Sequence, residues 1–183
     1  MSSLSSLGKE GFLPKEEMLE IGHKQSSLFI GLPKEKAFQE NRIAIIPDAV
    51  QLLISHGHEV WLESGAGDNA NFTDNEYSEA GAKIVYDTKE VYQADIIMKV
   101  EPPTIEEIAL MKGRQTLVSA LQITTQSKEY IEQLLEKKIT AIAFEYIHDE
   151  SGLMPIMRSM SEIAGNTSLL IASEYLSNAN NGK

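Results

Sequence analysis

One pattern constrains the fold of this chain more than any other. From residue 28 onward, short apolar runs rich in β-branched residues alternate with amphipathic segments of helical period. The run Ile96-Ile97-Met98 is apolar at every position, which is typical of parallel strands buried on both faces. The alternation therefore predicts an α/β, Rossmann-like (flavodoxin-like) fold, with a mostly parallel sheet and helices on both faces.

The expected strands span Leu28–Leu32, Glu59–Glu63, Lys83–Tyr86, Asp95–Val100, Thr116–Leu121 and Ile139–Tyr146. The expected helices lie between them, at Asp48–His56, Asp74–Ala80, Thr88–Gln93, Ile105–Lys112 and Ser127–Lys138. A longer, largely apolar segment from Met157 to about Ser177 predicts a C-terminal helix. Ligands bind beyond the carboxyl ends of parallel strands, so the loops that follow the strands are expected to form the site.

The charge balance excludes several classes of function. The 183 residues hold 16 Lys and Arg against 27 Asp and Glu, a net charge of −11, which argues against nucleic-acid or anionic-membrane binding. No run approaches the roughly 18 apolar residues of a membrane span, so membrane insertion is not expected. The chain has no cysteine, and its four histidines form no i, i+4 pair, so no metal site is expected. Its N-terminal segment has no secretory apolar run, which favours the cytoplasm.

A glycine motif after the second expected strand resembles a dinucleotide fingerprint only superficially. Residues 65–70 match G-x-G-x-x-A, but the fingerprint requires a helix that begins within the glycine run. Thr73 with Glu76 forms the better capping box, so we expect the helix to begin too late to bind a pyrophosphate. The motif is interpreted as a tight loop in which glycine adopts a positive φ.

Two cations near the carboxyl ends of strands are candidates for chemistry. Arg42 could hold a ligand carboxylate with its guanidinium fork, although its spacing alone favours a surface ion pair with Glu35 or Glu40. Lys99 lies in an otherwise apolar strand, and must either extend to solvent at the strand end or point into the ligand crevice. Glu101 follows it, and could face the same crevice or pair with Lys99.

Several blocks taken together resemble the N-terminal region of the alanine dehydrogenases, a region shared with the alpha subunit of pyridine nucleotide transhydrogenase. They are Gly31-Leu-Pro-Lys-Glu35, Glu40-Asn-Arg-Ile-Ala44, Gly57-His-Glu-Val60, Glu63-Ser-Gly-Ala-Gly67, Ala80-Gly-Ala82, Ala94-Asp-Ile-Ile-Met-Lys-Val100, Thr140-Ala-Ile-Ala-Phe-Glu145 and Met160-Ser-Glu-Ile-Ala-Gly165. The resemblance runs from about Leu28 to the end, with the blocks in the same order. It implies the substrate-side domain of an NAD-dependent oxidoreductase that deaminates L-alanine to pyruvate and ammonia.

Carried over by position, the resemblance assigns Arg42 to the substrate carboxylate, which reverses the preference for a surface ion pair, and Ser161 to the cofactor. Two positions depart from the family pattern. Glu101 stands in the Lys-Val-Glu-Pro stretch where alanine dehydrogenases read Lys-Val-Lys-Glu-Pro, and Gln122 occupies the slot of a catalytic histidine. Lys99, with Glu101 or Gln122, is therefore the catalytic set that we expect to polarise the substrate or relay protons.

These departures leave alternatives open. Glutamine can hydrogen-bond a substrate oxygen but cannot donate a proton as histidine does, so a transhydrogenase-type subunit, or a non-catalytic relative that binds NAD or a small carboxylate, remains possible. The stretch Gly152-Leu-Met-Pro155 follows the alanine dehydrogenase pattern rather than that of the transhydrogenase.

The resemblance also implies the domain organisation. We expect residues 1–27 to be an N-terminal extension, with a short helix near Lys15–His23, and residues 28–155 to be the Rossmann-like substrate domain. Residues 156–183 would be a connecting helix that leads to an NAD-binding domain absent from this chain. The isolated chain is then expected to be inactive, NAD is expected to bind mainly to the absent domain, and the protein is expected to be a homo-oligomer acting on a small molecule of the alanine/pyruvate class.

Overall fold

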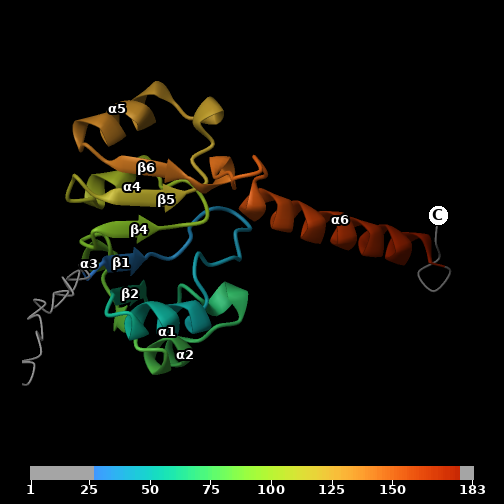
Figure 1. The fold of residues 1–183 in the computed structure, drawn as a ribbon, viewed down its shortest axis with the longest axis horizontal. Helices are drawn as coiled ribbons and strands as arrows, with labels where there is room; N and C mark the ends of the chain where they lie inside the picture. The colour runs from blue at the N-terminus through green and yellow to red at the C-terminus, as the bar shows by residue number, and fades with distance from the viewer. Residues whose placement is uncertain (1–26, 178–183) are drawn as a thin grey trace, which may run out of the picture.

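A computed structural model describes residues 27–177; the expected extension and its short helix at Lys15–His23, and the last six residues, lie outside the described residues. Six parallel strands form one sheet in the order β3-β2-β1-β4-β5-β6 (Figure 1). The strands are β1 (Phe29–Leu32), β2 (Glu59–Glu63), β3 (Lys83–Val85), β4 (Ile96–Met98), β5 (Thr116–Ser119) and β6 (Thr140–Ala143). The α/β prediction is confirmed, and the order is that of the Rossmann fold rather than the flavodoxin order 2-1-3-4-5.

The helices lie between and after the strands in the order that the sequence predicts. They are α1 (Pro47–Ser55), α2 (Asp74–Glu79), α3 (Thr88–Val91), α4 (Ile105–Leu110), α5 (Lys128–Glu136) and α6 (Pro155–Leu176), with three short 3₁₀ turns, η1 (Asp68–Ala70), η2 (Ile123–Thr125) and η3 (Phe144–Tyr146). Thr73 caps α2 through the capping box with Glu76 that the sequence predicts. The expected sixth strand is too long, because residues 144–146 turn into η3 rather than continuing the sheet.

Two apolar clusters cover the two faces of the sheet, because successive strand residues point to opposite sides. Ile30 and Leu32 pack with residues of α1 and α2 in one cluster, whereas Ile97 packs with Ile108 of α4 and Leu134 of α5 in the other. Strand β4 packs in both clusters, with Ile97 on one face and Ile96 and Met98 on the other. This explains why its sequence is apolar throughout.

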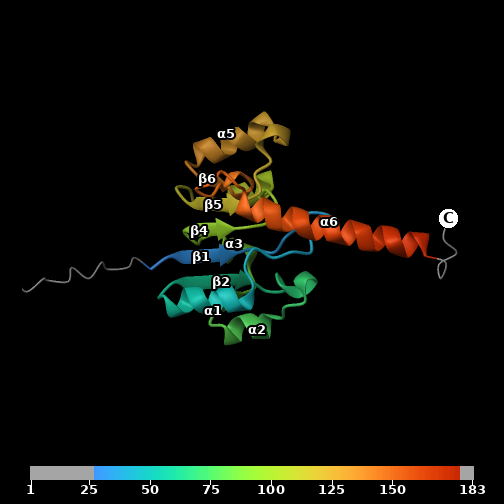
Figure 2. The same ribbon diagram turned by 45° about the vertical axis from the view of Figure 1, so that its right-hand side comes forward.

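Helix α6 differs from the others because none of its residues is buried. It extends from the carboxyl edge of the sheet away from the rest of the domain (Figures 1 and 2). Its exposed apolar residues include Ile163, Leu169, Leu170 and Tyr175. The helix that the sequence predicts is therefore present, while the division of the chain at residue 155 stays a prediction. Among the described residues, no helix is long and apolar enough to cross a membrane.

Gly31 is the position in β1 where the packing leaves no room for a side chain. A Cβ there would press against the Val91 carbonyl oxygen and lie 2.9 Å from the Cβ of Ala94. We expect Gly31→Ala to lower the free energy of unfolding by about 1–3 kcal/mol, because the backbone of α3 would have to move. Urea denaturation would measure the change.

Gly165→Ala is the matched control. Gly165 lies inside α6 with nothing within 4 Å of an added Cβ, so alanine there should only improve helix propensity, by about 0.5–1 kcal/mol. Equal effects of the two substitutions would contradict the packing argument.

Candidate functional site

The candidate site lies where the strand order reverses direction, between β1 and β4. The loop after β1 (residues 33–46) carries Arg42, the loop after β4 carries Glu101, and the loop after β5 carries Gln122. Because these strands are neighbours and parallel, their carboxyl ends meet at one edge of the sheet. The fold therefore brings these three predicted residues together.

The guanidinium of Arg42 is held by Glu40. One oxygen of Glu40 accepts from the Nε and the backbone N–H of Arg42, both at 2.8 Å, and the other accepts from Nη2 at 2.5 Å. Glu101 approaches the same nitrogen, with Oε1 3.7 Å from Nη2. The ion pair with Glu40 that the spacing favours is thus present, yet half of the Arg42 side chain remains exposed.

This geometry changes the acidity of both carboxyl groups. The hydrogen bonds from Arg42 lower the pKa of Glu40. Burial, together with the neighbouring Glu40 carboxyl, raises the pKa of Glu101, although the positive charge of Arg42 offsets part of this. Two carboxyl groups with pKa values pushed in opposite directions therefore lie on one guanidinium.

Gln122 completes this group of side chains. Its Nε2 donates to Glu101 Oε2 at 3.3 Å, and its backbone has a left-handed φ of 45°. The carboxylate of Glu145 holds that backbone in place, since it accepts from the N–H groups of Leu121 at 3.2 Å and Gln122 at 2.9 Å. The sequence alone gives Glu145 no role; its signal is a carboxylate two residues after the apolar strand β6.

The side chain of Lys99 does not extend to solvent, which is one of the two positions expected from the sequence. Its ammonium is buried, 2.8 Å from Glu107 Oε2 of α4 and 3.6 Å from Glu35 Oε2 of the loop after β1, and only 2 % of its side chain is exposed. Two buried carboxylates compensate its charge inside the protein, and Lys99 also lies in the wall of the apolar cavity beside Arg42, so its catalytic role stays a prediction. Burial raises the pKa of Glu35, and the charge of Lys99 opposes that rise.

The loop that carries Arg42 is fixed at both ends. Glu35 Oε1 accepts from the backbone N–H of Val100 at 2.6 Å, and the buried hydroxyl of Tyr77 donates to the carbonyl of Ile45 at 2.7 Å. Burial of Tyr77 raises the pKa of its hydroxyl to about 12, so this donor keeps its proton. Arg42 is consequently presented by a rigid loop.

Two adjoining cavities open beside Arg42. One of about 420 Å³ is mostly apolar, and its walls are Arg42, Ile43, Ala44, Met98, Lys99, Val100, Val118, Phe144, Ile147, Ile156 and Met160. The other, of about 380 Å³, includes Glu101, Gln122 and Glu145 among its walls. Ser161, on the first turns of α6, lines a further hollow with Arg42 and Met160, and its hydroxyl donates to the carbonyl of Met157 at 2.8 Å.

The glycine loop gives no nucleotide cradle. Gly65 has the positive φ expected of a tight turn, and a Cβ on Gly67 would lie 2.6 Å from the Phe72 carbonyl oxygen, so these glycines serve packing. Helix α2 begins at Asp74, after the capping box, as the sequence predicts. In residues 27–177, no three Asp, Glu or His side chains are placed to hold a metal ion.

The strand order and the parallel sheet define an α/β domain of the Rossmann class, with Arg42 beside its switch point. The chain belongs to the alanine dehydrogenase/PNT N-terminal domain family, whose model matches residues 31–164. It is 40 % identical over 157 residues to the alanine dehydrogenase of Methanococcus maripaludis. The aligned region covers 85 % of this chain and 42 % of that enzyme. It is 37 % identical over 156 residues to the alanine dehydrogenase of Bacillus subtilis, with 85 % and 41 % covered.

Solved structures of an alanine dehydrogenase and a transhydrogenase are similar to this chain in fold. An L-alanine dehydrogenase superposes with a TM-score of 0.78 at 34 % identity, over 84 % of this chain and 42 % of that one. A transhydrogenase from Sinorhizobium meliloti superposes with a TM-score of 0.72 at 26 % identity, over 80 % of this chain and 44 % of that one. The chain therefore spans less than half the length of these relatives.

Removing the ammonium of Lys99 should destabilise the domain strongly. Lys99→Met would leave the buried carboxylate of Glu35 without its cation and Glu107 with only the half-exposed Lys36, whose Nζ lies 3.6 Å from Oε1, and we expect the free energy of unfolding to fall by about 3–5 kcal/mol. Chemical denaturation at pH 7 measures it. The double variant Lys99→Met/Glu107→Leu should recover much of this loss; if it is as unstable as the single variant, the charge argument is wrong.

The ion pair of Glu40 and Arg42 should contribute to the pH dependence of the unfolding free energy at acid pH. Because the folded pKa of Glu40 is lowered from 4.5, its stabilising contribution is present above pH 4.5 and is lost as the pH falls through the folded value. We expect Glu40→Gln to flatten the fall of the unfolding free energy as the pH decreases below about 4.5. A series of urea melts over this range, compared with the exposed control Glu132→Gln, would test it.

Proposed function

We propose that this chain forms the substrate-side portion of an NAD-dependent oxidoreductase that deaminates L-alanine to pyruvate and ammonia. The observation that carries the proposal is the guanidinium of Arg42 at the switch point, half exposed beside two cavities and 3.7 Å from Glu101. The curated relatives carry the name alanine dehydrogenase, which supports the same reaction.

Arg42 has hydrogen-bond donors to spare for a substrate. Glu40 takes Nε and one N–H of Nη2, which leaves both N–H groups of Nη1 and the second of Nη2. Within residues 27–177, the acceptor near Nη1 is a weak one, the Met160 sulfur at 3.9 Å. A substrate carboxylate can bind bidentately along this second edge while Glu40 keeps the guanidinium in position.

Glu101 and Gln122 are the groups in position to act on the reacting centre. The raised pKa of Glu101 brings its carboxyl nearer to the range where it can gain and lose a proton during the reaction. Gln122, hydrogen-bonded to it, can orient either the carboxyl group or the substrate oxygen. We assign the proton transfer to Glu101 and an orienting role to Gln122.

Lys99 serves the site in a different way from the one expected. Its enclosed ammonium cannot reach a substrate without leaving two buried carboxylates. We propose that Lys99 is a positioning residue, which fixes the loop after β1 through Glu35 and thereby sets the place of Arg42.

The cofactor would be held mainly outside this chain. NAD, when bound, would accept the hydride that leaves the α-carbon of the substrate. The glycine loop after β2 offers no pyrophosphate cradle. Ser161, which lines one hollow with Met160, is the residue we assign to contact with the cofactor. We further propose, from the absence of cysteine, a cytoplasmic protein, and from the apolar residues exposed on α6, a homo-oligomer.

A transhydrogenase-type subunit is the second candidate. Hydride transfer between two nicotinamides needs no proton transfer from the protein, which would agree with Gln122 in the histidine slot and with the structural likeness to a transhydrogenase. A non-catalytic relative that binds NAD or a small carboxylate is the third candidate.

NADH formation by the full-length protein distinguishes these candidates. We expect turnover of L-alanine or another small amino acid, and we expect Glu101→Gln to lower kcat by about 10²–10⁴-fold because its carboxyl transfers the proton. Arg42→Ala should raise KM for the amino acid and leave NAD affinity unchanged, because its guanidinium binds only the carboxylate.

Lys128→Gln is the control, since Lys128 is exposed and forms only a surface ion pair with Glu132 on α5. NAD binding without turnover of any small amino acid would reject the dehydrogenase and favour the transhydrogenase. Binding of alanine or pyruvate without turnover would favour the non-catalytic relative.

A further inference from the structure

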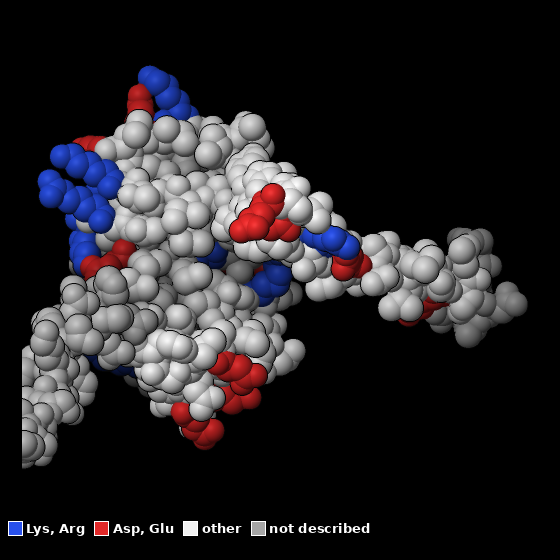
Figure 3. Space-filling model, in the orientation of Figure 1, with Lys and Arg blue, Asp and Glu red and all other residues white. Residues whose placement is uncertain are grey.

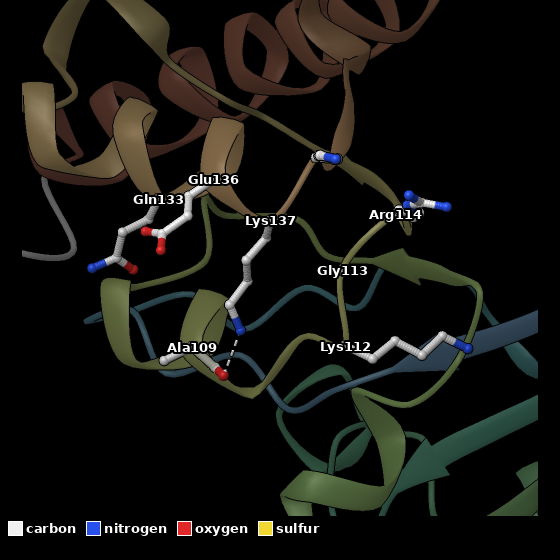
Figure 4. Close-up of a pocket in the computed structure, with 8 residues that line it drawn as sticks. Ala109, Lys112, Gly113, Arg114, Gln133, Glu136 and Lys137 are labelled. Atoms are coloured by element: carbon white, nitrogen blue, oxygen red, sulfur yellow. Dashed lines mark hydrogen bonds between the residues drawn. The ribbon is translucent and has the colours of Figure 1, made fainter.

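A cavity of about 620 Å³ lies at the opposite edge of the sheet from the candidate site. It is bordered by the turn that leads into β5 and the turn that leads into β6, with walls formed by Ala109, Lys112, Gly113, Arg114, Gln133, Glu136, Lys137 and Lys138 (Figure 4). Its volume is in the range of small-molecule sites. No residue of the crevice around Arg42 contributes to it.

The walls of this cavity are strongly basic in an acidic protein. Four of the eight wall residues are Lys or Arg, against the single carboxylate of Glu136, while the whole chain has a net charge of −11. Figure 3 shows Lys and Arg side chains gathered at this edge of the domain, at the left of the view. A concave surface of one sign attracts counter-ions of the other.

Two of the four cations already have partners. Lys137 Nζ donates to the carbonyls of Ala109 and Met111, both at 2.6 Å, and so caps the end of α4. Lys112 Nζ pairs with Asp95 at 2.7 Å and donates to the carbonyl of Gln93. The side chains of Arg114 and Lys138, in contrast, have no hydrogen bond or ion pair to any described residue.

Arg114 and Lys138 also share an unfavourable backbone. Both have a φ of 56°, in the left-handed region where a residue with a Cβ is strained and glycine or asparagine is preferred. The turns that hold them are locked together, because the backbone N–H of Arg114 donates to the carbonyl of Lys137 at 2.9 Å. Two unpaired cations are therefore held at a cost in stability, in a rigid frame beside one cavity.

At Lys138 the left-handed conformation belongs to the C-terminal turn of α5, since its N–H donates to the carbonyl of Leu135 at 2.9 Å and the N–H of Ile139 to that of Leu134 at 3.0 Å. Arg114 is not at a helix end, and strain of this kind is a reason to look for a ligand there.

We propose that this cavity, which we call the basic cavity, is a binding site for a small anion with a diphosphate or polyphosphate group. Arg114 offers a planar fork for phosphate oxygens and Lys138 a second positive charge, while Lys112 and Lys137 add to the positive field. One phosphate would match the two unpaired cations only in part, whereas two linked phosphates supply several acceptors. The site is separate from the proposed substrate crevice and does not depend on the function proposed there.

The competing explanation is that all four cations serve the ends of α4 and α5, whose carboxyl termini face this edge and attract positive charge. The two explanations differ in what glycine does to binding. Glycine relieves the left-handed backbone at either position, so a rise in the melting temperature is expected under both explanations. Only a ligand site predicts that pyrophosphate binding is weakened at the same time.

The test titrates the full chain with inorganic pyrophosphate by calorimetry, in a low-salt buffer without phosphate. We expect a dissociation constant below about 1 mM that weakens as salt is added. Arg114→Gly and Lys138→Gly should each weaken binding by about tenfold or more, and both should raise the melting temperature measured without ligand. Glu136→Gln, which removes the one carboxylate, should strengthen binding.

Lys128→Gln is the matched control, because it removes a charge from α5 away from the cavity and should change neither quantity. ATP binding at least as tightly as pyrophosphate, with uncharged adenosine failing to bind, supports recognition through the phosphates. The proposal is overturned if pyrophosphate does not bind, if the double variant Arg114→Gly/Lys138→Gly binds as well as the unaltered chain, or if adenosine binds as tightly as ATP.

Discussion

The buried ammonium of Lys99 is the constraint on which the carboxyl edge of the sheet depends. A charge enclosed in protein must be compensated, and Glu35 and Glu107 reach it from the loop after β1 and from α4. Glu35 uses its other oxygen to accept from the Val100 backbone, so the loop must cross from β1 to β4. Arg42 follows in the same loop and therefore comes to face Glu101. The geometry of the crevice is thus a consequence of burying one lysine.

A buried ion pair is weak support for stability by itself, since apolar side chains of similar volume often stabilise a core equally well. Its value here is positional. Apolar packing between β4 and the loop would tolerate small shifts, whereas a 2.8 Å contact between Lys99 and Glu107 fixes the distance and direction of the neighbouring backbone. Residues that act on a substrate need this accuracy, because small displacements of a binding group reduce the rate substantially.

The sequence predicted the fold well because its signals are local. Apolar runs gave every strand and Thr73 with Glu76 gave the start of α2, although Phe144–Tyr146 was wrongly joined to the last strand. The site was harder, because its decisive contacts join distant positions. Nothing near Lys99 in sequence shows that Glu35, 64 residues earlier, will meet it. The ion pair of Glu40 and Arg42, two residues apart, was foreseen from spacing, whereas the assignment of Arg42 to a substrate carboxylate came from the family resemblance and stays a proposal.

The charges around Arg42 also bear on the form of the ligand. Glu40, held at a lowered pKa, neutralises the guanidinium, and Glu101 adds a carboxyl 3.7 Å away. A 2-oxo acid brings only negative charge to this group, and its carboxylate would face Glu101 when that residue is ionised. An amino acid in its zwitterionic form brings an ammonium that can pair with Glu101 while its carboxylate takes the second edge of Arg42. Under the function we propose, Glu101 would therefore favour the amino acid over its oxo acid at this edge. The raised pKa of Glu101 would then have a use, since the same carboxyl could take the proton that the ammonium must lose before hydride transfer.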